Sequence, residues 1–266
     1  MTYTPALPLT GYAGWVLLKR TMAAQQKAFT ASAQIARDED YFKSKIGQIK
    51  TAEDLVADRR LLKVALGAFG LDDDITSKFF IRKILESNTL DTSSLANRLS
   101  DKKYLQLASA FGFGDYSTPR TQLSTFADEI LSAYETRSFE TAVGEQDDNL
   151  RLALNAEREL GKLAAKSSSE TTKWFTVLGD TPLRTVFEKA LGLPTAFGQL
   201  DVDKQLEMIR QKAEVQLGSA DISQFSDASA VTTLVRRFLV RSEISQYSAS
   251  TSGAQAALTL LQSRLR

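Results

Sequence analysis

Apolar residues recur every three or four positions along most of the chain, which is the spacing of one face of an α-helix. The stretch 119–146 shows this most clearly, with Leu123, Phe126, Ile130 and Tyr134 at intervals of three, four and four. Alternation of apolar and polar residues, the pattern of a half-buried strand, is nearly absent. The pattern predicts an all-α protein, an irregular multi-helix bundle of roughly a dozen helices.

The two ends of the chain differ in composition from the body. Residues 1–14 are rich in Pro and Gly and predict an extended N-terminal arm. Residues 245–253 are rich in Ser and predict a hinge before a last helix at 254–266. We therefore expect a single all-α body over residues 1–244, followed by the hinge and the C-terminal helix over 245–266.

A helical unit with the same start and the same stop occurs three times. It reads DRRLLKVALGAFGL at 58–71, DKKYLQLASAFGF at 101–113 and DTPLRTVFEKALGLP at 180–194. The opening Asp suits an N-cap, which binds free N–H groups of the first turn, and the Gly suits the left-handed residue that ends a helix. The similarity has two explanations, diverged repeats of one ancestral unit or convergence on a common way of capping a helix.

Three consecutive aspartates, Asp72, Asp73 and Asp74, follow the first of these units and raise the question of a cation site. A calcium-binding loop needs Gly at its sixth position and Glu at its twelfth. Counted from Asp72, those positions hold Ser77 and Lys83. We therefore expect a solvated turn in which Asp74 caps the next helix, and no metal site.

The chain of 266 residues contains neither Cys nor His. This excludes disulfides, thiolate zinc sites, Cys nucleophiles, Ser-His-Asp triads and imidazole metal sites. We therefore expect a non-enzymatic protein without catalytic, cofactor-binding or metal-binding residues. The alternative is a small-ligand binder, or an enzyme that uses carboxylates, with its site in a pocket between helices.

Arg236, Arg237 and Arg241 form a basic cluster on one predicted helix. Contact with an acidic partner or a phosphate is one interpretation, and a solvated face whose arginines pair with nearby acids is another. A nucleic-acid-binding helix is a further alternative. The formal charge of only +1, from 33 basic and 32 acidic residues, argues against a dedicated nucleic-acid binder, so we expect no nucleic acid as partner.

Two other segments carry apolar residues that suit contact with a partner protein. Trp15 follows the N-terminal arm, where it either anchors the helix to the core or contacts a partner. Leu258, Leu261 and Leu265 lie on one stripe of the C-terminal helix. Such a stripe must be buried against either the protein's own body or another chain, and the oligomeric state stays open.

No run of 18 or more apolar residues occurs, so we expect no membrane span. The N-terminal stretch MTYTPALPLTGYAGWVLLKR has no basic region ahead of its short apolar run and makes a poor secretory signal. We therefore expect a cytoplasmic protein. Export to the flagellum by a route without a cleaved signal is the alternative.

Long stretches of the chain resemble one bacterial family of unknown function, domain of unknown function 1217. The similar stretches include GYAGWVLLKRT, DYFKSKIGQIKTAEDLVADRRLLKVALGAFGLDDDI, FETAVGEQDDNLRLAL and PLRTVFEKALGLP. Members occur in flagellar gene neighbourhoods, so the resemblance implies a flagellum-associated protein that acts by protein–protein contacts in flagellar assembly or operation. It implies no activity and no catalytic residues. The Asn-rich N-terminal motif of rod and hook proteins is missing, so we do not expect a standard axial subunit.

Overall fold

The computed structural model describes residues 3–264, with side chains as far as Tyr247. Within these residues it contains thirteen α-helices, five short 3-10 turns and no strand, which confirms the prediction of an all-α fold. No helix in this part of the chain has the length and apolar character that a membrane crossing requires. The helices are α1 (Gly11–Thr30), α2 (Ala33–Lys45), α3 (Ala52–Ala57), α4 (Arg59–Phe69), α5 (Lys78–Leu85), α6 (Leu95–Arg98), α7 (Lys103–Phe111), α8 (Phe126–Gly144), α9 (Asp148–Ala164), α10 (Glu170–Gly179), α11 (Thr181–Leu191), α12 (Val202–Leu217) and α13 (Ala228–Arg264), and the 3-10 turns are η1 (Ile46–Gln48), η2 (Asp72–Thr76), η3 (Arg120–Gln122), η4 (Phe197–Gln199) and η5 (Ile222–Ser226).

The chain folds into two compact units, whereas the sequence pattern predicts one body over residues 1–244. Unit 1 contains Met1–Ala6 and Lys19–Gln146, and unit 2 contains Leu7–Leu18 and Asp147–Arg266. The boundary after Gln146 lies in the short turn between α8 and α9, and α1 contributes residues to both units. Neither boundary has the long Pro-, Gly- or Ser-rich linker by which a domain boundary is recognised in a sequence.

The core of unit 1 forms where α4 packs against α8 and α2. Two edge-to-face aromatic pairs in this core involve α8, Phe29 with Phe139 and Phe111 with Phe126, with ring centroids 5.7 and 5.0 Å apart. Such pairs add about 0.5–1.5 kcal/mol each beyond the burial of their area. They join α1 to α8 and α7 to the start of α8, so α8 is the central helix of this unit.

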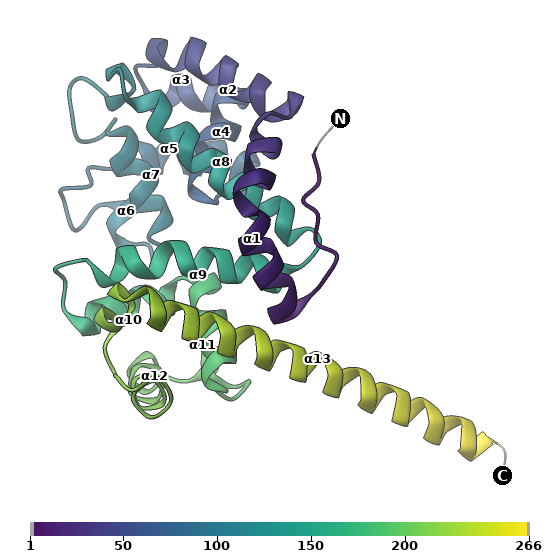
Figure 1. The fold of residues 1–266 in the computed structure, drawn as a ribbon. Helices are drawn as coiled ribbons and strands as arrows, with labels where there is room; N and C mark the ends of the chain where they lie inside the picture. The colour runs from purple at the N-terminus through teal and green to yellow at the C-terminus, as the bar shows by residue number, and fades with distance from the viewer. Residues whose placement is uncertain (1–2, 265–266) are drawn as a thin grey trace. The chain divides into compact units, whose positions relative to one another are not determined.

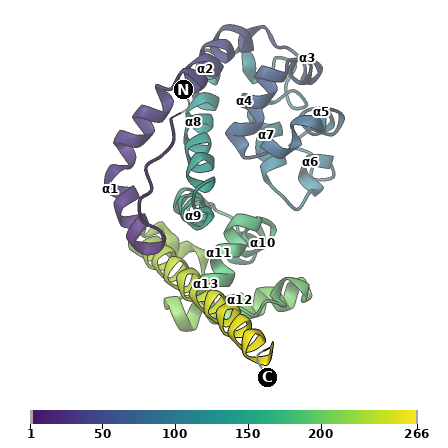
Figure 2. The same cartoon turned by 90° about the vertical axis from the view of Figure 1, so that its right-hand side faces the viewer.

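The core of unit 2 forms where α9, α11 and the first half of α13 lie side by side (Figure 1 and Figure 2). Phe187 of α11 is fully buried and makes edge-to-face contacts with Trp174 and Phe225, at centroid distances of 5.2 and 5.6 Å. The Trp174 indole N–H donates to the carbonyl of Ala220 at 2.8 Å. These contacts hold α10 and the turn η5 against α11.

The same helical corner, in which one Asp ends a helix and begins the next, occurs once in each unit. Asp58 ends α3 and begins α4 with φ −88° and ψ 103°, and Asp180 ends α10 and begins α11 with φ −95° and ψ 104°. Both carboxylates accept hydrogen bonds from N–H groups of the first turn, as the sequence predicts. The helices then end at Gly70 and Gly192, whose φ values of 68° and 60° lie in the left-handed region that favours glycine.

The surroundings of these two corners are also alike. A Cβ added at Gly70 would overlap the guanidinium of Arg137, and one added at Gly192 would overlap that of Arg241. An arginine from a longer neighbouring helix thus covers the C-terminal end of α4 and of α11, where the helix dipole favours a cation. This similarity of surroundings favours diverged duplication over convergence for the first and third copies.

The second copy of the unit ends at a left-handed glycine like the others, but its helix does not begin directly after the Asp. Gly112 has a φ of 66° and ends α7, as predicted. The carboxylate of Asp101 accepts a bond from the N–H of Lys103 at 2.9 Å, although the helix begins one residue later than in the other copies. α7 therefore has nine residues against eleven in α4 and α11, because it begins one residue later and this copy is one residue shorter.

The N-terminal arm is extended only as far as the start of α1 at Gly11, and its first residues are bound within unit 1. The side-chain amide of Gln25 accepts from the N–H of Ala6 at 2.7 Å and donates to its carbonyl at 3.3 Å. Gln146 donates to the carbonyl of Pro5 at 2.7 Å. Extended backbone has unpaired polar groups, and here two glutamines satisfy them. The arm is therefore bound to its own chain.

The backbone of α13 stays helical through residues 245–253, where the sequence pattern predicts a hinge. Serine disfavours helix interiors because its hydroxyl competes for backbone hydrogen bonds, but it can also bond back to the preceding turn. Ser245 does so, with its hydroxyl donating to the carbonyl of Arg241 at 2.9 Å. The last buried side chain described on α13 is Ser242, and all five residues from Glu243 to Tyr247 are exposed.

We predict that Gly192→Ala destabilises the protein by about 1 kcal/mol or more, because alanine strains a left-handed backbone and its Cβ displaces Arg241. Gly161→Ala in the same unit is the matched control, since Gly161 is helical and has no atom within 4 Å of the Cβ position. That variant should be stabilised by about 0.5–1 kcal/mol. Urea unfolding measures both, and equal effects would contradict the capping role.

We also predict that a chain lacking residues 245–266 still folds. No buried side chain described on α13 lies beyond Ser242, so the truncation should change the free energy of unfolding by less than about 1 kcal/mol. Circular dichroism and thermal melting test this. Unfolding or aggregation of the truncated chain would instead place its C-terminal helix in the core.

Candidate functional site

The three arginines predicted as a contact cluster lie together on one face of α13. Arg236, Arg237 and Arg241 line a shallow groove of about 520 Å³, together with Thr233, Val240 and Ile244. These positions recur every three or four residues, so they share one face of the helix. The opposite face is buried in the core of unit 2 through Leu234, Val235, Phe238 and Leu239.

Each arginine has a contact within unit 2, but none of these contacts is a carboxylate. The guanidinium of Arg236 lies 5.6 Å from the centroid of the Tyr12 ring. Arg237 donates to the side-chain carbonyl of Gln216, and its Nε is buried without an acceptor in the described part of the chain. Arg241 covers the glycine that ends α11. Pairing with nearby acids, one of the two interpretations of this cluster, is therefore not what the described side chains show.

Apolar side chains are exposed on this same face. Val240 is 38% exposed and Ile244 is 60% exposed. A single exposed aliphatic residue is common on a protein surface, but here both line one groove together with the three arginines. We call this set of six groove residues, Thr233 to Ile244, the α13 face.

The other predicted contact residues do not add to this surface. Trp15 is only 6% exposed, so the indole anchors the helix and does not offer a surface to a partner. Its place on the apolar side of α1, three residues before the buried Leu18, accounts for this. The side chains of Leu258, Leu261 and Leu265 lie outside the described residues.

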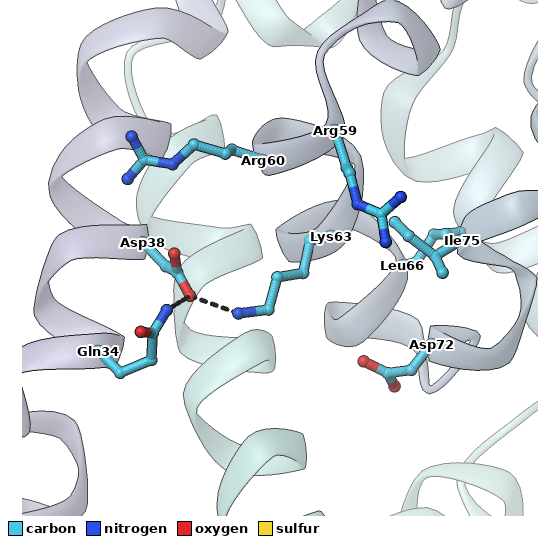
Figure 3. Close-up of a pocket in the computed structure, with 8 residues that line it drawn as sticks. All are labelled: Gln34, Asp38, Arg59, Arg60, Lys63, Leu66, Asp72 and Ile75. Carbon is cyan, nitrogen blue, oxygen red and sulfur yellow. Dashed lines mark hydrogen bonds and ion pairs between the residues drawn. The ribbon is translucent and has the colours of Figure 1, made fainter. Parts of the chain in front are cut away.

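A second hollow, of about 500 Å³, lies in unit 1 between α2, α4 and the turn η2 (Figure 3). This volume is within the range of about 300–1,000 Å³ that is common for small-ligand sites. We call it the α2–α4 pocket. Its lining residues are Gln34, Asp38, Arg59, Arg60, Lys63, Leu66, Asp72 and Ile75.

A buried carboxylate forms one wall of the α2–α4 pocket. The Oδ2 atom of Asp38 accepts hydrogen bonds from Nζ of Lys63 at 2.7 Å, from Nε2 of Gln34 at 3.0 Å and from the hydroxyl of Tyr134 at 3.2 Å. Asp38 is 6% exposed. Its donors come from α2, α4 and α8, so this one oxygen joins the three helices of the core.

The hydrogen bonds to Asp38 outweigh the cost of burying its charge. Burial by itself raises the pKa of Asp38, but the bonds from Lys63, Gln34 and Tyr134 and the charge of Lys63 hold that pKa below its ordinary value. Burial and the nearby carboxylate raise the pKa of Tyr134. Asp38 is thus an ionised and fully engaged structural acid, unsuited to the role of a catalytic base.

The sequence analysis did not single out Asp38 or Lys63, although one signal was present. Ile35, Asp38 and Phe42 are all buried on α2 and are spaced by three and four residues. An acid on the apolar face of a helix needs a partner when it is buried, so this spacing indicates a buried ion pair. The identity of that partner depends on tertiary contacts between α2 and α4.

The three aspartates after α4 form a 3-10 turn of their own. The prediction that Asp74 caps the next helix is wrong, because η2 extends to Thr76 and α5 begins after Ser77. Asp74 instead accepts a hydrogen bond from the hydroxyl of Tyr104 at 2.7 Å, while Asp72 lines the α2–α4 pocket. Among the described residues, no group of three carboxylates is arranged to hold a metal ion.

A buried lysine in unit 2 lies beside a serine hydroxyl, an arrangement that resembles a nucleophile with its base. Lys173 is 4% exposed and donates to Glu170 at 2.8 Å and to the hydroxyl of Ser223 at 3.1 Å. Burial by itself raises the pKa of Glu170, but bonds from Lys173, Ser223 and Ile222 lower it to about 2. A lysine base needs a free amine, whereas this one is paired with a carboxylate. We interpret the cluster as a set of structural hydrogen bonds that hold η5 against α10.

Two carboxyl groups face each other between α2 and α8. Burial raises the pKa of Glu39 to about 7, with a further contribution from Glu135 beside it. A carboxyl group with a raised pKa in the folded state favours folding while it is protonated. That contribution is fully present below the ordinary pKa and is lost as the pH rises through about 7.

We predict that Glu39→Gln stabilises the protein at about pH 8 and has little effect at about pH 4, because glutamine removes the ionisation that burial disfavours. The midpoint of urea unfolding, measured across this range, checks the prediction. Glu145→Gln is the control, because Glu145 is an exposed acid in the same unit. A stabilisation by Glu39→Gln that does not change with pH would contradict this account.

Comparison with known proteins gives a family and a solved structure. The family model described as "Protein of unknown function (DUF1217)" matches residues 68–231. The X-ray crystal structure of protein AGR_C_984 from Agrobacterium tumefaciens is similar to this chain at 26% sequence identity and a TM-score of 0.74, over 91% of this chain and 99% of that one. A search of curated proteins finds no match. Because the family model matches more than half of the residues, this chain belongs to the DUF1217 family of proteins of unknown function.

Proposed function

We propose that the protein is a non-enzymatic binding protein that docks an acidic partner protein on the α13 face, in flagellar assembly or operation. The observation that carries the proposal is the charge of this face. Arg236, Arg237 and Arg241 have no carboxylate partner in the described part of the chain, and the exposed Val240 and Ile244 line the same groove.

A partner with carboxylates and apolar side chains on one surface complements this face. Guanidinium groups bind carboxylates with two parallel hydrogen bonds, and such pairs are stronger when water is excluded around them. Val240 and Ile244 supply apolar area that excludes this water once it is covered. Complementary charge also speeds association and rejects partners of like charge. An amphipathic acidic helix has these properties.

The flagellar part of the proposal rests on the family. The chain belongs to the DUF1217 family. The sequence resemblance to this family implies an association with flagellar genes, and that expectation motivates the class of partner. Proteins encoded together often act together, so a flagellar protein with an acidic surface is the expected occupant of the α13 face.

A nucleic acid is the less suitable occupant of this face. The arginines would suit phosphates, but Val240 and Ile244 in the same groove offer apolar area that a phosphate backbone does not use. The formal charge of +1 gives little long-range attraction for a polyanion. Binding of duplex DNA that weakens steeply with salt would favour the nucleic acid instead.

We predict that Arg236→Glu combined with Arg241→Glu abolishes the function in cells. The test is complementation of swimming in a deletion strain. Wild-type protein should restore swimming and the double variant should fail, because two reversed charges weaken binding of an acidic partner at least about tenfold. The matched control is Lys204→Glu with Lys212→Glu on α12, which changes the net charge equally at two exposed lysines of the same unit.

The outcomes of this test separate the two parts of the proposal. Normal swimming of the deletion strain would overturn the flagellar role. Restored swimming by the double variant, with thermal melting showing that it is folded, would overturn the role of the α13 face. Equal failure of the control variant would show that overall charge decides, and not this surface.

A further inference from the structure

The α2–α4 pocket of unit 1 contains two opposite charges that do not pair with each other. Arg59 stands at the start of α4, and Asp72 begins the turn η2 that follows the same helix. Figure 3 shows the Arg59 side chain extending along the pocket toward Leu66 and Ile75, with the Asp72 carboxylate farther along. Neither side chain forms an ion pair in the described part of the chain.

The other charged groups of this pocket are already engaged. Lys63 donates to Asp38 at 2.7 Å. Arg60 donates to the backbone carbonyl of Arg37 at 3.1 Å, and its guanidinium carbon lies 3.8 Å from the centroid of the Tyr41 ring. One cation and one anion therefore remain in the pocket without partners.

The environment of Asp72 shows that its charge is poorly satisfied. The residue as a whole is exposed, yet its Oδ1 lies only 3.2 Å from where a Cβ would stand on Gly67. Burial of the carboxylate and the charge of Asp73 raise the pKa of Asp72 above its ordinary value, which a bond to its own backbone and the charges of Arg137 and Lys63 offset only in part. No side chain of the described residues donates to it. A donor from outside the chain would stabilise this carboxylate.

We propose that the α2–α4 pocket binds a small zwitterion with an aliphatic body, such as a free amino acid. Its carboxylate is held by the guanidinium of Arg59, and its ammonium group by the carboxylate of Asp72. Its apolar part lies against Leu66 and Ile75, which line the same pocket. The volume of about 500 Å³ accommodates a ligand of this size.

The unpaired charges determine this class of ligand. A simple anion would satisfy Arg59 and leave Asp72 without a donor, and a simple cation would do the reverse. Arg59 and Asp72 are both exposed at the mouth of the pocket, and a ligand that carries both signs gains a charge-assisted hydrogen bond at each end. This site is independent of the α13 face, and its test does not depend on any protein partner.

The test is isothermal titration calorimetry on the full chain with four probes. L-leucine and 6-aminohexanoate are zwitterions with a short and a long separation of their charges. Isopentylamine and 4-methylpentanoate have similar aliphatic bodies but one charge each. We expect at least one zwitterion to bind with a Kd between about 1 µM and 1 mM, and both single-charge probes to bind at least about tenfold more weakly.

Variants decide whether binding occurs in this pocket. Arg59→Gln and Asp72→Asn should each weaken binding of the zwitterion at least about tenfold, because each removes one charge-assisted contact. Arg98→Gln is the matched control, since Arg98 is an exposed arginine of the same unit that does not line the pocket. That variant should change the affinity less than about twofold. Thermal melting verifies that each variant is folded. If Asp72→Asn does not fold, the affinity of Arg59→Gln alone decides whether the ligand binds in this pocket.

Three results would overturn the proposal. The first is that neither zwitterion binds at a ligand concentration of about 10 mM. A Kd above that concentration is weaker than that of a specific small-ligand site. The second is equal affinity for a zwitterion and its single-charge analogue. The third is an equal loss of affinity in Arg59→Gln and Arg98→Gln, which would show that the loss does not come from a contact in this pocket.

Discussion

In each unit, one aspartate carboxylate at the junction of two helices fixes where the second helix begins. Asp58 and Asp180 close one helix and open the next with no loop between them, and their side chains satisfy the N–H groups that the new helix leaves free. Each new helix then has eleven residues before a left-handed glycine ends it. The start and the length of α4 and α11 are thus fixed locally, and each packs its apolar face on a longer helix of the same unit, α8 or α13.

The same corner connects the scaffold to the proposed binding surface. In unit 1 the arginine that covers the capping glycine, Arg137, belongs to α8. In unit 2 that arginine is Arg241, which also lines the α13 face beside Arg236 and Arg237. One side chain therefore stabilises the end of α11 while it contributes charge to the groove. A surface fixed in this way is rigid, which lowers the entropy cost of binding a partner.

The sequence was sufficient to predict the all-α class and the caps of α4 and α11. Asp58, Asp180, Gly70 and Gly192 were identified from the residues alone, because capping depends on groups within one turn of the helix. The same local argument failed for Asp74. A tyrosine 30 residues away in the chain competes for its carboxylate, and no local pattern contains that information.

The division into two units and the α2–α4 pocket could not be predicted from the sequence. The boundary after Gln146 has the composition of an ordinary turn between two helices. The pocket combines Asp38 of α2 with Arg59 and Asp72 on both sides of α4, so it exists only once those helices pack. The basic cluster of α13 was visible as a pattern, but its lack of carboxylate partners depends on which acids the fold places nearby.

Site-specific photo-crosslinking in motile cells tests the central claim most directly. A photoreactive residue at Val240 in the α13 face is compared with one at Val215 of α12, an exposed valine in the same unit. The account predicts that position 240 captures one flagellar protein through an acidic segment, and that position 215 does not. Equal capture at both positions, or no capture at position 240 in swimming cells, would contradict it.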